Sequence, residues 1–216
     1  GGELGTMLAV AADRASVQAL LGDLPGITFA NHNGPSQLVL SGHPADLEAA
    51  RQRLDSRDIT ATPLPVAAAF HSPLVAPARE RLAEFMAEVE FQAPAFAVYG
   101  NADARPYPGD PDAIRARLGE HLVAPVRFMD EIRAMRAAGA RVFLEVGPKE
   151  ALTRLTRQIL GSEPHLAVAT DGSGGGMIGL LHALAALWSQ GAALNVERLF
   201  EGRAVAAPDL ERLVET

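Results

Sequence analysis

The sequence predicts an α/β protein built in two parts. Short apolar runs alternate with helical patterns through residues 1–66, and longer helical segments separate isolated strands after Ala67. Hydrophobic residues make up 48% of the 216 residues and charged residues 21%, values typical of a globular chain that buries a core. Alternating strands and helices pack as layers, so we expect helices to cover the faces of the sheets.

The first part holds four predicted strands and two predicted helices. The strands are expected at residues 6–12, 27–31, 37–41 and 60–66. Asp13 is a suitable N-cap for the first helix, and Pro44 is a suitable first residue for the second. Residues 33–36 (NGPS) indicate a hairpin turn, and the prolines of the last strand favour a sheet edge. The order βαββαβ is that of a ferredoxin-like small domain, with two helices on one face of an antiparallel sheet.

The second part is predicted to be an α/β layer structure with an incomplete sheet. Helices are expected at residues 73–89, 112–122, 130–138, 150–160 and 178–190, and strands at residues 96–99, 141–146 and 166–170. The first of these helices has an apolar face that includes Phe85 and Val89. The glycine-rich residues 172–176 lack the Gly-Lys-Ser/Thr ending of a phosphate-binding loop, which favours a flexible connector.

Composition argues against several classes of function. The net charge of −7 is unlike that of a general nucleic-acid binder. The absence of cysteine excludes disulfides, thiolate metal sites and cysteine nucleophiles, and the six histidines have no metal-ligand spacing. The longest nearly apolar stretch, residues 178–188, is shorter than the roughly 18 residues of a membrane-spanning helix. No G-x-S-x-G nucleophile elbow occurs, and the first residue is not Met, which suggests an internal piece of a longer protein.

The pentapeptide AFHSP at residues 69–73 carries the first candidate for chemistry, His71. Ser72 is a predicted N-cap and Pro73 a preferred first helical residue, so His71 lies at a junction between an extended segment and a helix. The positive end of that helix would disfavour protonation and leave a neutral imidazole that can act as a base. A partly buried, hydrogen-bonded structural histidine is the competing interpretation.

Residues 120–128 (EHLVAPVRF) carry a second candidate, the backbone carbonyl of His121. Pro125 has no N–H, so a helix that reached it would leave the carbonyl four residues earlier without a partner. A free carbonyl can hold the second nitrogen of a general-base histidine and so fix its tautomer. An ordinary helix end with water on its last carbonyls is the alternative.

Asn33 and Gln37 either present two amides to a ligand or belong only to a hairpin turn.

Five motifs follow one another along most of the chain. They are GTMLAV at residues 5–10, ANHNGPSQ at 30–37 with SG at 41–42, LPV at 64–66 with AFHSP at 69–73, APVRF at 124–128 and FLEVGP at 143–148. In this order they resemble the C-terminal part of the malonyl-CoA:acyl-carrier-protein transacylase domains of polyketide and fatty-acid synthases. Residues 68–71 and 104–108 are most similar to the iterative synthases of enediyne cores and polyunsaturated fatty acids.

The resemblance implies a division into three regions. Residues 1–66 would be a ferredoxin-like small subdomain, and residues 67–170 the C-terminal portion of an α/β-hydrolase-like large subdomain into which it is inserted. Residues 171–216 would be a linker and helix that follow the domain. The implied reaction is ping-pong: a serine takes a malonyl group from coenzyme A and passes it to the phosphopantetheine thiol of an acyl carrier protein. No bound cofactor or metal is implied beyond the coenzyme A thioester and the phosphopantetheine acceptor.

The resemblance also assigns roles to individual residues. His71 matches the general base, and His121 matches the residue whose backbone carbonyl orients that base. Phe70 matches a position that selects malonyl. Ala68, and Asn33 and Gln37 with their two amides, are the other expected substrate-binding residues. Malonyl-type domains often carry His where this sequence has Ala68. The serine of the family lies upstream of the small subdomain, so we expect this chain to be inactive alone.

The expected partners are malonyl-CoA, an acyl carrier protein, the missing N-terminal half of the acyltransferase and the neighbouring synthase domains. We expect no binding to nucleic acid or to a membrane, and a location in the cytoplasm. A second interpretation is a non-catalytic docking or scaffold fragment of a megasynthase, which binds a carrier protein or a neighbouring domain. A G-H-S-x-G motif upstream of Gly1 would decide in favour of the enzyme.

Overall fold

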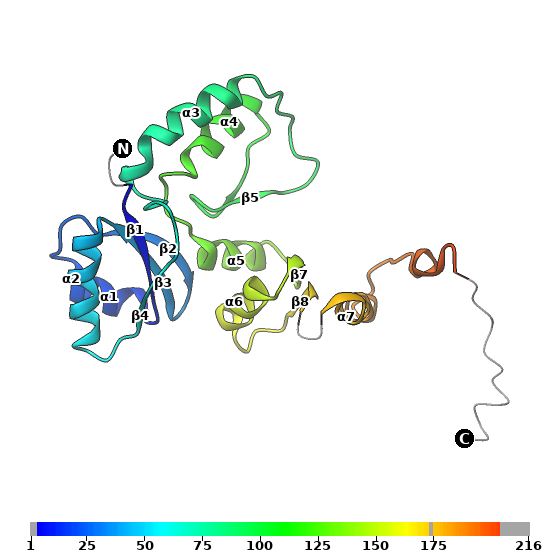
Figure 1. Ribbon diagram of the computed structural model, residues 1–216. Coiled ribbons are helices and arrows are strands. Elements are labelled where there is room, and N and C mark those ends of the chain that lie inside the picture. The colour runs from blue at the N-terminus through cyan, green and yellow to red at the C-terminus, as the bar shows by residue number, and fades with distance from the viewer. Residues whose placement is uncertain (1–3, 173–174, 204–216) are drawn as a thin grey trace.

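A computed structural model describes residues 4–172 and 175–203 of the chain (Figure 1). The first part contains β1 (Thr6–Val10), α1 (Arg14–Leu21), β2 (Thr28–Gly34), β3 (Gln37–Gly42), α2 (Pro44–Asp55) and β4 (Ala61–Pro63). Its four strands form one antiparallel sheet in the order β2-β3-β1-β4. The predicted order of elements, the hairpin and the edge position of the last strand are therefore confirmed.

Local chemistry fixes where these elements begin and end. The Asp13 carboxylate accepts the backbone N–H of Ser16 at 3.0 Å and so caps α1, and Pro44 is the first residue of α2. The two bounds that differ most from the prediction are the ends of β2 and β4. β2 runs on to Gly34, which leaves a two-residue turn before β3, and β4 is only three residues long because prolines cannot donate to the ladder.

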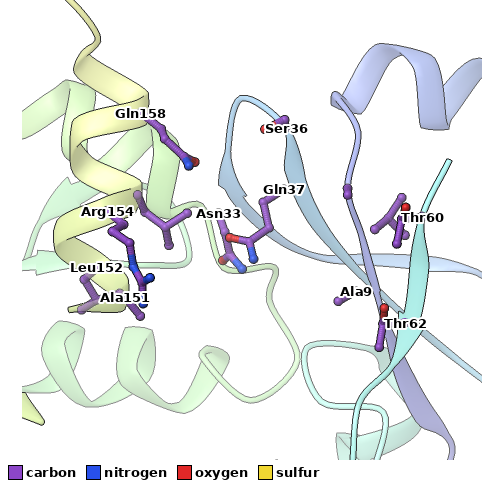
Figure 2. A pocket seen from close by; sticks show the side chains of 13 residues that line it. Ala9, Asn33, Ser36, Gln37, Thr60, Thr62, Ala151, Leu152, Arg154 and Gln158 are labelled. Carbon is purple, nitrogen blue, oxygen red and sulfur yellow. The ribbon is translucent and has the colours of Figure 1, made fainter. Parts of the chain in front are cut away.

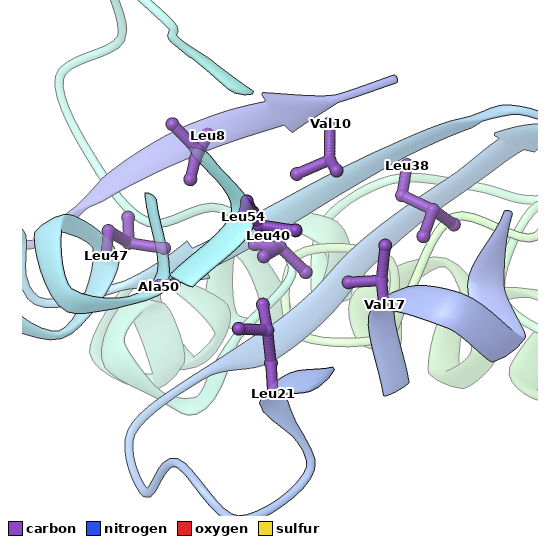
Figure 3. Close-up of a cluster of buried hydrophobic side chains, with 9 residues drawn as sticks. All are labelled: Leu8, Val10, Val17, Leu21, Leu38, Leu40, Leu47, Ala50 and Leu54. Atoms are coloured by element: carbon purple, nitrogen blue, oxygen red, sulfur yellow. The ribbon is translucent and has the colours of Figure 1, made fainter. Parts of the chain in front are cut away.

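Helices α1 and α2 cover one face of this sheet, and the core lies between them (Figure 3). Nine buried residues form it: Leu8, Val10, Val17, Leu21, Leu38, Leu40, Leu47, Ala50 and Leu54. A second, smaller cluster of Met7, Ala30 and Val39 packs with Leu64 and Val66. These three strand residues alternate with core residues along their strands, so the sheet has apolar side chains on both faces.

The second part follows the sheet and has a looser organisation. Its elements are η1 (Pro73–Val75), α3 (Ala76–Ala87), β5 (Tyr99–Gly100), β6 (Arg105–Pro106), α4 (Pro111–Glu120), α5 (Phe128–Ala137), β7 (Val142–Pro148), α6 (Ala151–Leu160), β8 (Leu166–Asp171), α7 (Gly176–Ser189) and η2 (Val196–Phe200). β5 and β6 form a short antiparallel pair, whereas β7 and β8 are parallel neighbours joined by α6. Helix α5 packs against β2, so the two parts meet at that strand.

Residues 73–100 differ most from the prediction. The single helix expected at residues 73–89 is a 3-10 turn followed by α3, and the strand expected at residues 96–99 is wrong except at Tyr99. The side chains of Phe85 and Phe96 are 66% and 77% exposed, while Met86 is buried. Apolar spacing predicted that Phe85 shares an apolar face with Val89, but the contacts of α3 with α4 leave the Phe85 side chain exposed.

The apolar outer side of β7 is also open among the described residues. Val142, Leu144 and Val146 alternate along it and are 37%, 40% and 79% exposed. Parallel strands are normally buried on both faces, so this two-stranded unit has the character of part of a larger sheet. No helix in residues 4–172 and 175–203 is long and apolar enough to cross a membrane.

Candidate active site

His71 has an unusual backbone conformation. Its φ angle is +58°, in the left-handed region that non-glycine residues rarely adopt. Such a residue persists only where its surroundings hold it. The Ser41 hydroxyl donates to the carbonyl of Phe70 at 2.6 Å, and the His71 N–H donates to the carbonyl of Leu122 at 2.9 Å. The turn that presents His71 is therefore fixed from the small sheet on one side and from the α4–α5 connection on the other.

The imidazole of His71 is fixed through one nitrogen. Its Nδ1 lies 2.9 Å from the carbonyl oxygen of His121 and 3.1 Å from that of Ala124. Both partners can only accept, so Nδ1 carries the proton and the neutral ring has its lone pair on Nε2. The predicted contact with the His121 carbonyl is confirmed, and the Ala124 carbonyl is a second acceptor that sequence reasoning missed. This tautomer is the one that a general base needs.

The segment that carries the Ala124 carbonyl is bonded to the small sheet. Helix α4 ends at Glu120, a turn follows at residues 121–123, and Val126 then forms a single parallel bridge to Asn31 of the edge strand β2. The His32 N–H donates to the Val126 carbonyl and the Val126 N–H donates to the Ala30 carbonyl, both at 2.8 Å. Because Ala124 lies two residues before Val126, the edge of β2 sets the position of one acceptor of His71. The site is thus shared between the two parts of the chain.

The ring of His121 makes a contact of its own. Its Nε2 lies 2.8 Å from the hydroxyl of Tyr107, and the guanidinium of Arg117 lies 4.7 Å from the centre of the Tyr107 ring. Burial lowers the pKa of His121, and the nearby positive charge of Arg117 lowers it further, so the ring is neutral at pH 7. Tyr107 and Arg117 were not predicted as site residues, although Tyr107 lies in the distinctive segment 104–108.

The remaining predicted site residues fall into two groups. Phe70 precedes His71 and is 39% exposed, while Ala68 is buried. Asn33 and Gln37 line a cavity of about 640 Å³ between the sheet and α6, to which Arg154 and Gln158 also contribute (Figure 2). Neither Phe70 nor His71 is among the described residues that line that cavity. The structure therefore brings His71, His121 and Phe70 together and places the two amides at a separate cavity.

Two hydroxyl groups close to His71 in sequence or space are already engaged. The Ser72 hydroxyl donates to the Ala69 carbonyl at 2.6 Å, and the Ser41 hydroxyl donates to the Phe70 carbonyl at the same distance. Both serines are buried at 1% exposure or less. Their hydroxyl protons point to backbone carbonyls, so neither serine is arranged to give its proton to His71.

Asn31, on β2 beside Val126, has a buried Oδ1 atom without a hydrogen-bond partner among the described residues.

Comparison with known proteins gives consistent matches. The sequence matches the family described as "Acyl transferase domain" over residues 3–192. The polyketide biosynthesis protein ThaF of Burkholderia thailandensis is 34% identical over 186 residues, which are 86% of this chain and 16% of that protein. The polyketide biosynthesis malonyl CoA-acyl carrier protein transacylase BaeC of Bacillus velezensis is 33% identical over 160 residues, 73% of this chain and 55% of that protein.

A solved structure agrees with these sequence matches. The acyltransferase domain of the iterative polyketide synthase in enediyne biosynthesis is 29% identical with a TM-score of 0.78, covering 92% of this chain and 51% of that one. The chain spans about half the length of the transacylase and of the solved domain that it matches, and a smaller share of ThaF.

Proposed function

The chain belongs to the acyl transferase domain family, and we propose that it is the part of a malonyl transacylase that carries the general base. The reaction moves a malonyl group from coenzyme A to the phosphopantetheine thiol of an acyl carrier protein through a serine ester. The observation that carries this proposal is the imidazole of His71, which is held by two carbonyls at Nδ1 with Nε2 left for proton transfer.

In the first half-reaction, Nε2 of His71 accepts the proton of the serine hydroxyl as the serine oxygen attacks the thioester carbonyl. The imidazolium then gives that proton to the departing thiolate of coenzyme A. In the second half-reaction, Nε2 takes the proton of the phosphopantetheine thiol, and the serine leaves as the new thioester forms and recovers the proton. A positioned base of this kind contributes about 10²- to 10⁴-fold to the rate.

The carbonyls of His121 and Ala124 have two roles in this scheme. They hold the ring so that Nε2 faces the reacting atoms, and their negative ends stabilise the positive charge that the imidazole gains in each step. A buried carboxylate serves the same purpose in Ser-His-Asp triads. Two neutral carbonyls carry less negative charge than a carboxylate, so stabilisation of the His71 imidazolium needs both contacts.

The serine is supplied from outside these 216 residues. Three observations support this part of the proposal: the hydroxyls of Ser41 and Ser72 are engaged, the transacylase BaeC is about twice as long as the matched part, and the outer side of β7 is uncovered among the described residues. Residues 1–66 then act as a ferredoxin-like small subdomain, and residues 67–170 complete an α/β-hydrolase-like large subdomain with the serine-bearing segment. Residues 171–216 are the proposed linker and helix that follow, and residues 173–174 and 204–216 of this region lie outside the described residues. Alone, the chain forms no acyl-enzyme.

Phe70, Ala68, Asn33 and Gln37 bind the substrate in this proposal. Phe70 lies next to the base, where its ring borders the acyl group. The cavity of about 640 Å³ beside Asn33 and Gln37 is within the range of about 300–1,000 Å³ for small-molecule sites. Carboxamide side chains pair with amides, and the phosphopantetheine arm carries two of them, so this cavity suits the arm. Both substrates are cytoplasmic, which favours a cytoplasmic location.

The experiment compares this chain alone with the intact acyltransferase domain, meaning this chain joined to its serine-bearing segment. Each is mixed with malonyl-CoA and then with a carrier protein, and intact masses are recorded. We expect a malonyl adduct on a serine outside the 216 residues, which transfers to the carrier protein and forms slowly in His71→Ala. His182→Ala, at an exposed position on α7, is the matched control. An adduct on a serine of this chain, or full activity in His71→Ala, would contradict the proposal.

A further inference from the structure

Three side chains pack closely around Gly100 in the short strand β5. A Cβ atom at Gly100 would lie 3.2 Å from Tyr107, 3.3 Å from the guanidinium of Arg117 and 3.4 Å from Nε2 of His121. Contacts of 3.0–3.4 Å are tighter than nine in ten real Cβ contacts. The absence of a side chain at this position is therefore part of how the three groups fit together.

Arg117 holds Tyr107 in place. Its Nη1 donates to the carbonyl of Pro106 and its Nη2 to that of Arg105, both at 2.6 Å, and it forms an ion pair with Asp103. The same guanidinium lies over the Tyr107 ring, and the Arg117 side chain is only 17% exposed. The residues directly before Tyr107, and the Tyr107 ring itself, are thus tied to α4 through Arg117.

The hydrogen bond between Tyr107 and His121 joins two uncharged groups. Burial raises the pKa of Tyr107, so the phenol keeps its proton, and the pKa of His121 is lowered chiefly by burial and also by Arg117. A neutral imidazole has one accepting nitrogen. We assign the Tyr107 hydroxyl as the donor to Nε2 of His121 over 2.8 Å, which places the His121 proton on Nδ1; the opposite direction would place that proton on Nε2.

We propose that Tyr107 is a positioning residue that acts on His71 through His121. His121 is the C-cap of α4, where the regular helical hydrogen bonds end. The bond from Tyr107 fixes its ring, and so fixes the residue whose carbonyl lies 2.9 Å from Nδ1 of His71. The order of dependence is Arg117, Tyr107, His121 and then the base. The effect on rate rests on the function proposed above, whereas the effect on the two rings does not.

The first test measures the histidine rings in the 216-residue chain itself. With ¹⁵N-labelled histidine, NMR reports which ring nitrogen of His71 and of His121 carries the proton. In the unmodified chain we expect both neutral rings to carry it on Nδ1. In Tyr107→Phe we expect His121 to become a mixture of tautomers and the Nδ1–H signal of His71 to broaden or shift. Tyr99→Phe is the matched control, because Tyr99 is the other tyrosine of the chain and lies beside Gly100.

If Tyr107→Phe does not fold, the same measurement is made on Gly100→Ala. This variant keeps every polar group, and its added methyl group displaces the contact between Tyr107 and His121 by a few tenths of an ångström. The proposal would be overturned if the rings of His71 and His121 kept the tautomers of the unmodified chain in a folded Tyr107→Phe or Gly100→Ala variant.

The second test measures rate in the intact acyltransferase domain. A small displacement of a reacting group can slow a reaction by about 100-fold, so we expect Tyr107→Phe to lower kcat by about 10- to 100-fold with KM for malonyl-CoA unchanged. Tyr99→Phe should leave both constants unchanged. Altered rings in Tyr107→Phe combined with full activity in His71→Ala would refute the proposed function and leave the positioning relation intact. Unaltered rings combined with an inactive His71→Ala would refute the positioning role alone.

Discussion

Nδ1 of His71 lies 2.9 Å from the carbonyl oxygen of His121, a residue 50 positions later in the chain. The contact joins a turn held by Ser41 to a helix end held by Tyr107. Local contacts alone do not bring the two residues together, because His71 has a positive φ and His121 lies at the end of its helix. The geometry of the base therefore depends on the packing of the small sheet against the second part.

The proposed base gives the first prediction. In the intact acyltransferase domain, His71→Ala should lower the single-turnover rate of acylation by at least about 10²-fold, because no group then accepts the serine proton. The fold should be kept, since the side chain is only half-buried. Rapid-quench measurements with malonyl-CoA provide the rate, and circular dichroism checks the fold. An acylation rate equal to that of the unmodified domain would return His71 to a structural role.

The second prediction separates the backbone of His121 from its ring. His121→Gln should be mild, because the carbonyl to His71 remains and the glutamine carboxamide can accept the Tyr107 hydroxyl. His121→Ala keeps the same carbonyl but leaves Tyr107 without its acceptor, so it should cost about 10-fold or more. The measurement is kcat for transfer to a carrier protein with both variants side by side. Equal losses in the two variants would show that the ring contact has no part in holding the base.

The βαββαβ order could be predicted from sequence because its signals are local. Asp13, Pro44 and residues 33–36 each determine an element boundary through their own backbone chemistry. The face of α3 at Phe85 could not be predicted in the same way, because its burial depends on what packs against it. Spacing indicates which side chains share a face but not whether another element covers that face.

The site was predictable to a similar extent. Pro125 indicated that the His121 carbonyl would be free, and the AFHSP motif indicated His71, so their contact could be expected from the family resemblance. Tyr107 and Arg117 gave no such signal, because their contacts join β6, α4 and the helix end in three dimensions. Asn33 and Gln37 were expected to bind the substrate together with Phe70, but the structure places them at the cavity beside α6.

The third prediction concerns Gly5, directly before β1. Its φ angle is +71°, and a Cβ atom there would lie 2.6 Å from the carbonyl of Gly42 and 2.7 Å from the Cβ of Ala69. Gly5→Ala should therefore lower the free energy of unfolding by more than about 1 kcal/mol, through both backbone strain and the clash. Gly139→Ala is the control, because its φ is +107° and nothing lies within 4 Å of its Cβ position. Urea unfolding measures both, and equal losses would mean that the clash with Ala69 is relieved without cost.

The last prediction concerns the choice of acyl group. Phe70 directly precedes the base and its side chain is 39% exposed, so in the proposed site its ring occupies the space beside the acyl chain. A ring at this position fills the volume that the α-methyl group of methylmalonyl would need. One methyl group in a pocket changes discrimination by roughly 1–3 kcal/mol, or about 10- to 200-fold. Phe70→Ser should therefore shift selection toward methylmalonyl by an amount in this range.

The measurement places malonyl-CoA and methylmalonyl-CoA in one tube with the intact acyltransferase domain and compares the two acyl-enzymes by mass. Phe85→Ser is the matched control, since it removes an exposed phenylalanine on α3, an element that does not contain the base. The turn at residues 69–72 should survive Phe70→Ser, because Ser41 bonds to the backbone carbonyl of residue 70 and not to its side chain. A ratio of acyl-enzymes that does not move in Phe70→Ser, with total acylation preserved, would show that another residue selects the substrate.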